Sequence, residues 1–387
     1  MGALRYLTAG ESHGPALVVI VEGVPAGLRV TPEAIGRDLA RRRQGYGRGA
    51  RMRLEADELE ILGGVRHGVT LGSPVAVVVR NTEWEKWSQA MSPTEVADPP
   101  KPLTRPRPGH ADLVGMLKYG HRDARNVLER ASARETAART VAGTLARLLL
   151  DEIGVAVVSH VVNIGGVWTS GSDIPGPTDQ EKVDASAVRC LDAGDEEAMI
   201  AAIERAKADG DTLGGVFEVV AHGVPVGLGS YVHWDRKIDG RLAQALLSIN
   251  AMKAVAVGDG FDAHASPGSA AHDEILWNDA DGYHRASNRA GGIEGGVTTG
   301  DPLRVRVVMK PLSTLRKALR TVDVETKEEA VAIVERTDTC AVPSACVIGE
   351  AIVGFVLADA ALEKFGADSV DEFRANHAAW VESLKKA

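Results

Sequence analysis

Apolar residues along this chain follow two patterns, one typical of strands and the other typical of helices. Short runs rich in Val, each bounded by Gly or Pro, predict strands. They cover residues 16–21, 75–79, 155–162, 216–220 and 303–309. Several of these runs alternate only imperfectly between apolar and polar residues, so we expect sheets in which at least one face is well covered.

The helical pattern, with apolar residues three and four positions apart, occurs in longer segments. These are residues 32–43 after Thr31 as N-cap, 129–151, 195–209 closed by Gly210, 240–255 and 343–365. The segments 129–151 and 343–365 carry Ala and Gly on most sides. Helices without a polar face are buried, so we expect these two to be central.

The chain contains an internal repeat. GVPAGL at residues 23–28 returns as GVPVGL at 223–228, in both cases directly after a predicted strand. GGVRHGVTLGSP at 63–74 returns as GGIEGGVTTGDP at 291–302, in both cases directly before one. The matches are strongest at Gly and Pro, which set the geometry of turns.

A weaker echo relates residues 127–143 to 333–349, so the order of the repeated pieces is preserved. We therefore predict one domain over residues 1–387, of α/β (α+β) class, built from two similar halves at roughly 1–165 and 210–366.

Long connections rich in Pro, Gly, Ser or charge cover residues 81–108, 165–185 and 262–289. Structureless loops of this length inside a compact protein usually form functional lids or are disordered. We expect lids.

Composition is that of a soluble globular protein, with 44% hydrophobic and 25% charged residues. No apolar run approaches the roughly 18 residues of a membrane span, and no secretory signal pattern occurs at the N-terminus. Three Cys without a CxxC motif suit a reducing compartment, so we expect a cytoplasmic protein without disulfides or membrane association. Eleven His occur without HExxH spacing, and His264 with His272 lacks a third ligand, so we predict no metal site.

Charge is distributed unevenly along the chain. The net charge is -9, but residues 1–53 carry nine Arg, no Lys and four acidic residues. The arm RRRQGYGRGARMR at 41–53 has two interpretations. Its Arg residues either cap the preceding helix and stay solvated, or bind a small anion through bidentate contacts. Its GxGxG follows a helix and not a strand, so it is no dinucleotide fingerprint.

Two polar segments present a histidine. GESHG places His13 on a Gly-flanked turn before a strand, where the ring is either a proton donor or a group that satisfies the turn. RPRPGHAD holds His110 on a segment stiffened by two Pro, which suits a positioned acid or base but also a plain surface loop.

The segment ERASARET at 129–136 begins a predicted central helix. Ser132 and Glu135 fit a capping box, while a helix N-terminus flanked by Arg also suits an anion. Its echo places Arg336 and Asp338 at the start of the second central helix. The repeat thus predicts one composite site where the two helices begin.

Together these segments resemble the chorismate synthase family. The matching motifs, in family order, are GESHG, RRRQGYGR, RPGHAD, SARET, SINAMKAVAVGDGFD, NRAGGIEGG, KPLST and RTDTCAVPSA. The resemblance implies conversion of 5-enolpyruvylshikimate-3-phosphate to chorismate and phosphate. The reaction is a 1,4-anti elimination that requires reduced FMN but causes no net redox change. The family fold is a βαβ sandwich, with central helices between two sheets, assembled as a homotetramer.

The resemblance also implies roles for individual residues. His13 protonates the departing phosphate, His110 protonates the reduced flavin, and Asp338 relays the substrate proton through the flavin. The implied flavin contacts are Arg130, Ala131, Ser132, Asn250, Ala251, Gly295, Lys310, Pro311, Leu312, Ser313, Thr314 and Arg336. Arg42 and Arg48 match substrate or NADP phosphate contacts, and Arg107 and Arg134 are expected to help hold the substrate.

No additional domain is evident that could reduce flavin, so we expect an external flavin reductase, with NADPH as the source of electrons. Two rival functions stay open. A nucleic-acid-binding module could use the Arg arm, although only 4% of residues are aromatic and the net charge is negative. An ordinary flavin oxidoreductase would instead accumulate an oxidised product.

Overall fold

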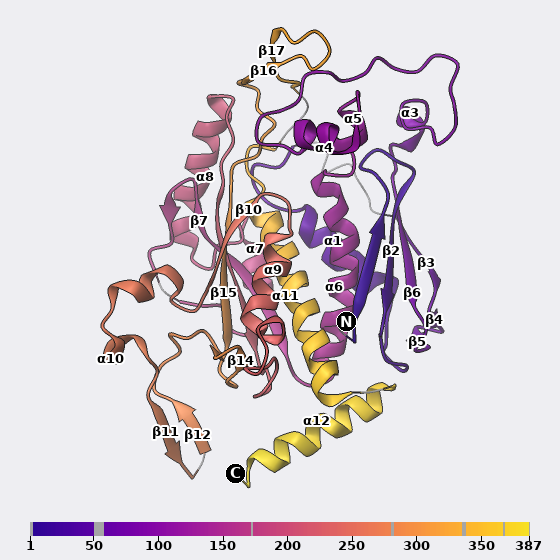
Figure 1. Ribbon diagram of the computed structural model, residues 1–387. Coiled ribbons are helices and arrows are strands. Elements are labelled where there is room, and N and C mark those ends of the chain that lie inside the picture. The colour runs from indigo at the N-terminus through magenta and orange to yellow at the C-terminus, as the bar shows by residue number, and fades with distance from the viewer. Residues whose placement is uncertain are drawn as a thin grey trace.

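The computed structural model describes residues 3–49, 58–171, 173–279, 282–334, 338–366 and 368–386. Within these ranges two antiparallel sheets enclose a layer of helices (Figure 1). The four-stranded sheet has the order β1 (Arg5–Ala9), β2 (Ala16–Glu22), β6 (Val75–Arg80) and β3 (Glu58–Gly63). The five-stranded sheet has the order β10 (Met252–Val257), β15 (Leu303–Met309), β9 (Gly215–His222), β7 (Ala156–Ile164) and β8 (Val167–Trp168). All five predicted strands are present.

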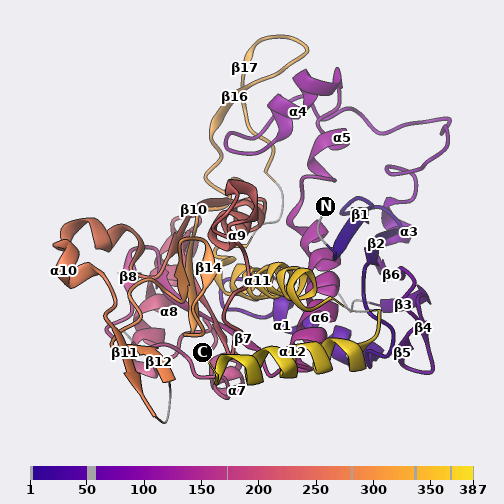
Figure 2. The ribbon, with the colours of Figure 1, turned by 60° about the horizontal axis from the view of Figure 1, so that its bottom comes forward.

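The helices between the sheets are α1 (Pro32–Arg43), α6 (Thr136–Asp151), α9 (Ile238–Leu247) and α11 (Val342–Phe365). Figure 2 shows α6 and α11 side by side between the two sheets. Small residues make this close approach possible, since a Cβ at Gly143 on α6 would lie 2.6 Å from the Ala351 carbonyl oxygen of α11. The predicted sandwich with central helices is therefore confirmed.

The repeated turns make the same hydrogen bonds in both halves. The buried hydroxyl of Thr70 accepts from the Leu28 N–H at 2.9 Å, and that of Thr298 accepts from the Leu228 N–H at 2.8 Å. Each hydroxyl then donates over 2.6 Å to the carbonyl of a proline, Pro25 or Pro225. Thr70 and Thr298 thus lock the two GVPxGL turns in the same way. The boundaries of the halves stay a prediction.

The segment 129–151 differs from its prediction, because α6 begins only at Thr136. A 3-10 turn, η1 (Ala133–Glu135), and the short α5 (Arg125–Leu128) precede it. The predicted capping box is wrong. Ser132 does cap the turn by accepting from the Arg134 N–H, but the Glu135 carboxylate bonds Thr8 and Arg139. Glu135 thus bonds Thr8 and Arg139 in place of the Ser132 backbone N–H that a capping box requires.

The predicted helix 240–255 is also too long, since α9 ends at Leu247 and β10 follows. Between them Ala251 adopts a left-handed backbone with a φ of 68°, which no helix interior permits. The last residues then pair with β15, with Val255 opposite Val307. The helical pattern failed here because sheet pairing to a strand about 50 residues away in sequence overrides local preference.

Three predicted lids take different forms. Residues 81–108 include α3 (Trp84–Trp87) and extend to the cavity described below. Residues 165–185 include β8 and α7 (Gln180–Ala185), and none of the described residues among them lines that cavity. Residues 262–289 hold η3 (Gly260–Ala265), α10 (Gly268–Ala271) and the hairpin β11 (Ile275–Asn278) and β12 (Gly282–Arg285), which projects from the lower left of Figure 1. The lid prediction is therefore wrong for the last two segments.

The remaining elements lie around this framework. They are β4 (Val65–Arg66), β5 (Val69–Thr70), α4 (Asp112–Tyr119), α8 (Ala193–Ala208), η2 (Trp234–Arg236), β13 (Ile293–Glu294), β14 (Val297–Thr298), β16 (Arg320–Val322), β17 (Glu329–Val331) and α12 (Val370–Leu384). The hairpin of β16 and β17 bonds to the 104–106 segment through Thr321 and Val324.

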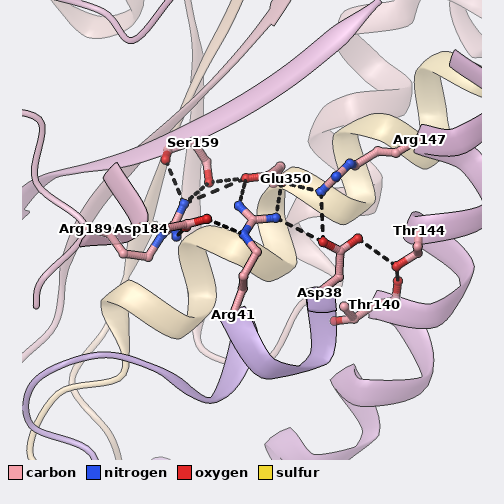
Figure 3. A network of polar contacts seen from close by, with 9 residues as sticks. All are labelled: Asp38, Arg41, Thr140, Thr144, Arg147, Ser159, Asp184, Arg189 and Glu350. Atoms are coloured by element: carbon pink, nitrogen blue, oxygen red, sulfur yellow. Dashed lines mark hydrogen bonds and ion pairs between the residues drawn. The ribbon is translucent and has the colours of Figure 1, made fainter. Parts of the chain in front are cut away.

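A buried ion network ties the central helices together (Figure 3). Glu350 of α11 accepts hydrogen bonds from Arg41 of α1 at 2.8 and 2.9 Å and from Arg147 of α6 at 2.6 Å. Burial alone would raise the pKa of Glu350, but the guanidinium groups of Arg41 and Arg147 outweigh it and hold that pKa at about 2. Asp38, Asp184, Arg189, Ser159, Thr140 and Thr144 complete the network in Figure 3.

Among the described helices, α11 is long and apolar enough to cross a bilayer. In this fold 94% of its most apolar window is buried between the sheets, as in the core helix of a soluble protein. Glu350 and Asp359 interrupt the apolar residues of this helix, so it holds no uninterrupted apolar run of about 18 residues, as expected. Burial explains its apolar composition. The three cysteines are free and buried.

Candidate active site

A cavity of about 1090 Å³ lies where α6 and α11 begin, at their upper ends in Figure 1. Its wall gathers segments that are far apart in sequence. The predicted site residues on its lining are His13, Arg42, Arg48, Arg107, His110, Ala131, Ser132, Arg134, Asn250, Ala251, Lys310, Leu312, Ser313, Thr314 and Asp338. The predicted composite site at the two helix starts is present as a cavity.

His13 occupies the turn between β1 and β2. Its Nδ1 lies 2.7 Å from Oε2 of Glu129, and the same oxygen accepts from the His13 backbone N–H at 3.1 Å. The indole of Trp87 stacks on the imidazole, with ring centroids 3.9 Å apart. The ring is therefore held on one edge and one face, and it lines the cavity.

His110 stands on another part of the wall. Its Nδ1 contacts Oδ1 of Asp112, the first residue of α4. Arg107 donates from Nε to Asp112 Oδ2 at 2.8 Å and from Nη1 to the Thr314 hydroxyl at 3.0 Å. Burial alone would raise the pKa of Asp112, but hydrogen bonds from His110 and Arg107 hold it well below its usual range. Asp112 is therefore an anion that orients both side chains.

Asp338 lies at the edge of the cavity, just before α11. Its Oδ2 is 2.8 Å from Arg48 Nη1, and its Oδ1 accepts from the Gly49 N–H at 2.6 Å. The Gly-rich arm after α1 thus folds against the start of α11. Arg48 is not a freely solvated charge, because this ion pair holds it at the wall.

Other arginines of the predicted site are held mainly by backbone groups. Arg42 donates to the Thr136 hydroxyl at 3.1 Å and to the Ala133 carbonyl at 3.0 Å, so it ties α1 to the start of α6. Arg130 donates to the carbonyls of Thr8 and Gly10 and does not line the cavity. Its guanidinium clamps β1 instead.

Three further predicted residues are not on the described lining. Gly295 lies in the turn between β13 and β14, close to Tyr231 and away from the cavity. Pro311 is absent from the lining, although the residues on both sides of it contribute. Arg336 lies outside the described residues.

Several charged side chains on the cavity lining were not identified from the sequence. Lys253 and Arg316 add positive charge to the lining. The Lys310 ammonium donates to the Gly109 carbonyl at 2.7 Å, and its pKa is lowered by burial and by nearby Lys253. Within the described part of the chain, no cluster of three or more His, Cys, Asp or Glu is arranged to hold a metal ion.

Signals for some of the missed residues were present. Asp112 ends the RPGHAD motif two positions after His110, and Lys253 lies inside the SINAMKAVAVGDGFD segment. Glu129 begins the ERASARET segment, but its contact with His13 carried no signal, because the two residues are 116 positions apart and only the fold brings them together.

Known proteins resemble this chain over nearly its whole length. Residues 4–362 match the family model described as chorismate synthase. Chorismate synthases of Salinispora tropica and Streptomyces coelicolor are 59% and 58% identical, covering 98% and 99% of this chain and 99% of each relative. A solved structure titled "Crystal Structure of Chorismate Synthase" is 41% identical, with a TM-score of 0.80 and 99% of both chains covered. The chain therefore belongs to the chorismate synthase family.

Proposed function

We propose that this chain converts 5-enolpyruvylshikimate-3-phosphate to chorismate and phosphate, as a carbon–oxygen lyase of the shikimate pathway of aromatic amino acid biosynthesis. The reaction is a 1,4-anti elimination that uses reduced FMN without net redox change. The observation that carries the proposal is one cavity that combines two carboxylate-paired histidines, His13 and His110, with a cluster of cationic side chains.

The charge of the cavity matches the substrate, which carries a phosphate and two carboxylates. Seven Arg or Lys side chains are on the described lining, against two acidic ones, Glu129 and Asp338. Guanidinium groups bind phosphate and carboxylate through pairs of parallel hydrogen bonds. We expect Arg48 and Arg134 to hold substrate anions, while Arg107 is already committed to Asp112 and Thr314 and helps to shape the wall.

The two histidines supply the acids that the reaction needs. Each ring has its Nδ1 against a buried carboxylate, so a proton exchanged with a ligand passes through Nε2. His13 is the proposed donor to the departing phosphate, and His110 is the second donor. Asp338 is the proposed proton acceptor, held in place by Arg48 and by the Gly49 N–H.

The residues of the cavity fit a flavin cofactor. Its volume of about 1090 Å³ exceeds the upper end, roughly 1000 Å³, of typical small-molecule sites, which leaves room for a cofactor beside the substrate. The residues proposed to hold reduced FMN are Ala131, Ser132, Asn250, Ala251, Lys310, Leu312, Ser313 and Thr314. Lys253 and Lys310 offer ammonium groups to its phosphate. When bound, reduced FMN supplies electron density that assists loss of phosphate.

We also propose a homotetramer in the cytoplasm that receives reduced flavin from a separate, NADPH-dependent reductase. Leu7 of β1, Ile20 of β2 and Leu62 of β3 are exposed on the first sheet. Contiguous exposed apolar patches typically mark protein contacts. Trp277 and Tyr283 on the projecting β11–β12 hairpin are exposed as well. Sedimentation velocity on the purified chain tests the assembly.

Anaerobic turnover tests the reaction. We expect chorismate and phosphate to form in equal amounts when catalytic FMN is photoreduced, and no turnover with oxidised FMN alone. Steady activity in air without a reductant would contradict the cofactor requirement. An oxidised product accumulating in step with turnover would favour an ordinary flavin oxidoreductase. Tight, steeply salt-dependent binding of a random oligonucleotide would instead favour the nucleic-acid module.

A further inference from the structure

The side chain of Glu129 contacts the turn that carries His13. Its side chain is only 1% exposed, and Oε2 faces both the backbone N–H and the ring Nδ1 of His13. Oε1 has no hydrogen-bond partner in the described structure, and its nearest cation is Arg125 Nη1 at 3.6 Å. The negative charge of this buried carboxylate is therefore only partly neutralised by its neighbours. It acts on the imidazole of His13 beside it.

The contact selects one tautomer of the ring. An ionised carboxylate accepts hydrogen bonds and cannot donate them, so Nδ1 of His13 must carry the proton. Nε2 is then either protonated, in the imidazolium, or an acceptor. A proton taken up or released by His13 therefore moves through Nε2.

The rest of the turn does not depend on the carboxylate. The Ser12 N–H donates to the Glu129 backbone carbonyl at 2.9 Å, a bond that any residue at position 129 can make. The Asn81 amide donates to the carbonyls of Ser12 and Gly14 at 3.3 and 3.0 Å. Trp87 covers one face of the ring, and Arg125 lies 5.6 Å from the Trp87 ring centroid. The backbone of the turn thus has supports besides the bond from the His13 N–H to the Glu129 carboxylate.

His110 provides an internal comparison. Its partner Asp112 also receives hydrogen bonds from the Nε and Nη2 of Arg107, so a guanidinium already compensates that carboxylate. Glu129 has no such bidentate partner in the described structure, where its nearest guanidinium lies at 3.6 Å. Arg107 therefore neutralises much of the charge of Asp112, whereas more of the charge of Glu129 acts on the imidazole of His13.

We propose that Glu129 is a positioning residue that holds His13 in the Nδ1-protonated form, so that Nε2 delivers the proton to the departing phosphate. The inference rests on the proposed function of His13. In that step the carbon–oxygen bond to phosphate breaks, its electron pair stays on the phosphate oxygen, and that oxygen takes the proton from Nε2. Neutral His13 remains, protonated on Nδ1 and bonded to Glu129.

The test uses Glu129→Gln and Glu129→Asp, with Glu85→Gln as the matched control. The backbone N–H and the ring of His13 both face Glu129 Oε2, and the Arg125 guanidinium lies 3.6 Å from Oε1. An amide offers one acceptor oxygen and a donating NH₂ group in place of the two carboxylate oxygens. Asp keeps the charge on a shorter side chain. Glu85 is exposed on α3, in the same region as Trp87, and its change removes a carboxylate without touching the site.

The first readout is ¹⁵N NMR of the histidine rings in the ligand-free full chain, with His13 assigned by its loss in His13→Gln. Wild type is expected to show the Nδ1-protonated form or the imidazolium, and Glu129→Gln a shift toward the Nε2-protonated tautomer. A wild-type ring protonated on Nε2 alone overturns the proposal even if no variant folds. This readout needs no substrate, so it stands apart from failure of the proposed reaction.

The second readout is steady-state turnover with photoreduced FMN. Glu129→Gln should lower kcat by roughly 10- to 10,000-fold, the span for losing a well-placed acid, with KM changed less than about threefold. Glu129→Asp should recover part of the loss, and Glu85→Gln should match wild type. The proposal is overturned if kcat is unchanged in Glu129→Gln. It is also overturned if kcat falls, Glu129→Asp does not recover it, and the His13 tautomer is the same as in wild type.

Discussion

Arg48 and Asp338 join the two halves of the repeat at the edge of the cavity, where Arg48 Nη1 lies 2.8 Å from Asp338 Oδ2. Arg48 belongs to the Gly-rich arm after α1, and Asp338 precedes α11. The adjacent Gly49 N–H donates to the other carboxylate oxygen. An anion that binds Arg48 therefore shares the guanidinium with Asp338, so substrate binding and the position of the proposed proton acceptor are linked.

Replacing Arg48 tests this link. Arg48→Ala should weaken substrate binding by about 2–4 kcal/mol, the range for leaving a partly buried charged partner without its counterion. Arg48→Lys should also bind poorly, because an ammonium cannot form the planar pair of hydrogen bonds that a guanidinium makes. Titration calorimetry with flavin present measures both affinities. Unchanged affinity together with a lowered melting temperature would show that the arm serves folding or assembly.

Removing either imidazole should affect catalysis more than binding. His13→Ala and His110→Ala are each expected to lower kcat by roughly 10- to 10,000-fold, with a modest change in KM, because a positioned acid contributes mainly in the transition state. Anaerobic phosphate release measures the rates. His264→Ala, at an exposed position of η3, is the matched control and should retain wild-type activity. Wild-type rates in both site variants would mean that these histidines are structural.

The buried network around Glu350 should make stability depend on pH. Its folded pKa of about 2 lies below the ordinary value of 4.5, so its contribution is complete above about pH 4.5 and is lost as pH falls toward about 2. Urea unfolding across this window should give a falling free energy of unfolding in wild type. The fall should be smaller in Glu350→Gln, which has no carboxylate to protonate at this position.

The same variant should be less stable at neutral pH. Glu350→Gln removes one of the two carboxylates that Arg41 and Arg147 share, the other being Asp38. Breaking such a buried pair costs about 3–5 kcal/mol. Urea midpoints at about pH 7 measure the difference. Glu60→Gln, on an exposed pair with Arg80, is the control and should cost less than about 1 kcal/mol. Equal stability of Glu350→Gln and wild type would mean that the network contributes no net stability.

Two Gly→Ala changes should have opposite effects on stability, because one lies where α6 contacts α11 and the other lies on α1. Gly143→Ala should destabilise by about 1–3 kcal/mol, since the new methyl group would overlap Ala351. Gly36→Ala on α1 meets only the Leu59 side chain, at 3.9 Å, and should be neutral or stabilise by up to about 1 kcal/mol through helix propensity. Thermal unfolding of both variants checks the pair. A destabilised Gly36→Ala with a neutral Gly143→Ala would reject this account of the packing.

Local pattern and repetition determined much of this protein from its sequence alone. Valine-rich runs identified β2, β6, β7, β9 and β15 because a strand covered on its faces needs apolar side chains along its length. Thr31, Pro32 and the Arg run at the end of α1 marked that helix to the residue, since capping depends on neighbours in sequence. The His and Arg motifs named His13, Arg48 and His110 as candidate site residues, and the resemblance to the chorismate synthase family implied others, such as Asn250 and Lys310. All of these line the cavity.

Tertiary structure decided what depends on partners distant in sequence. Whether residues 252–257 form strand or helix rests on pairing with β15, and the start of α6 depends on the bonds of Glu135 with Thr8 and Arg139. The carboxylate that holds His13 comes from Glu129, 116 positions away. Hydrogen bonds and ion pairs act over a few ångströms in space, whereas sequence patterns record only neighbours along the chain. Only the packed sheets and helices bring such groups within that reach.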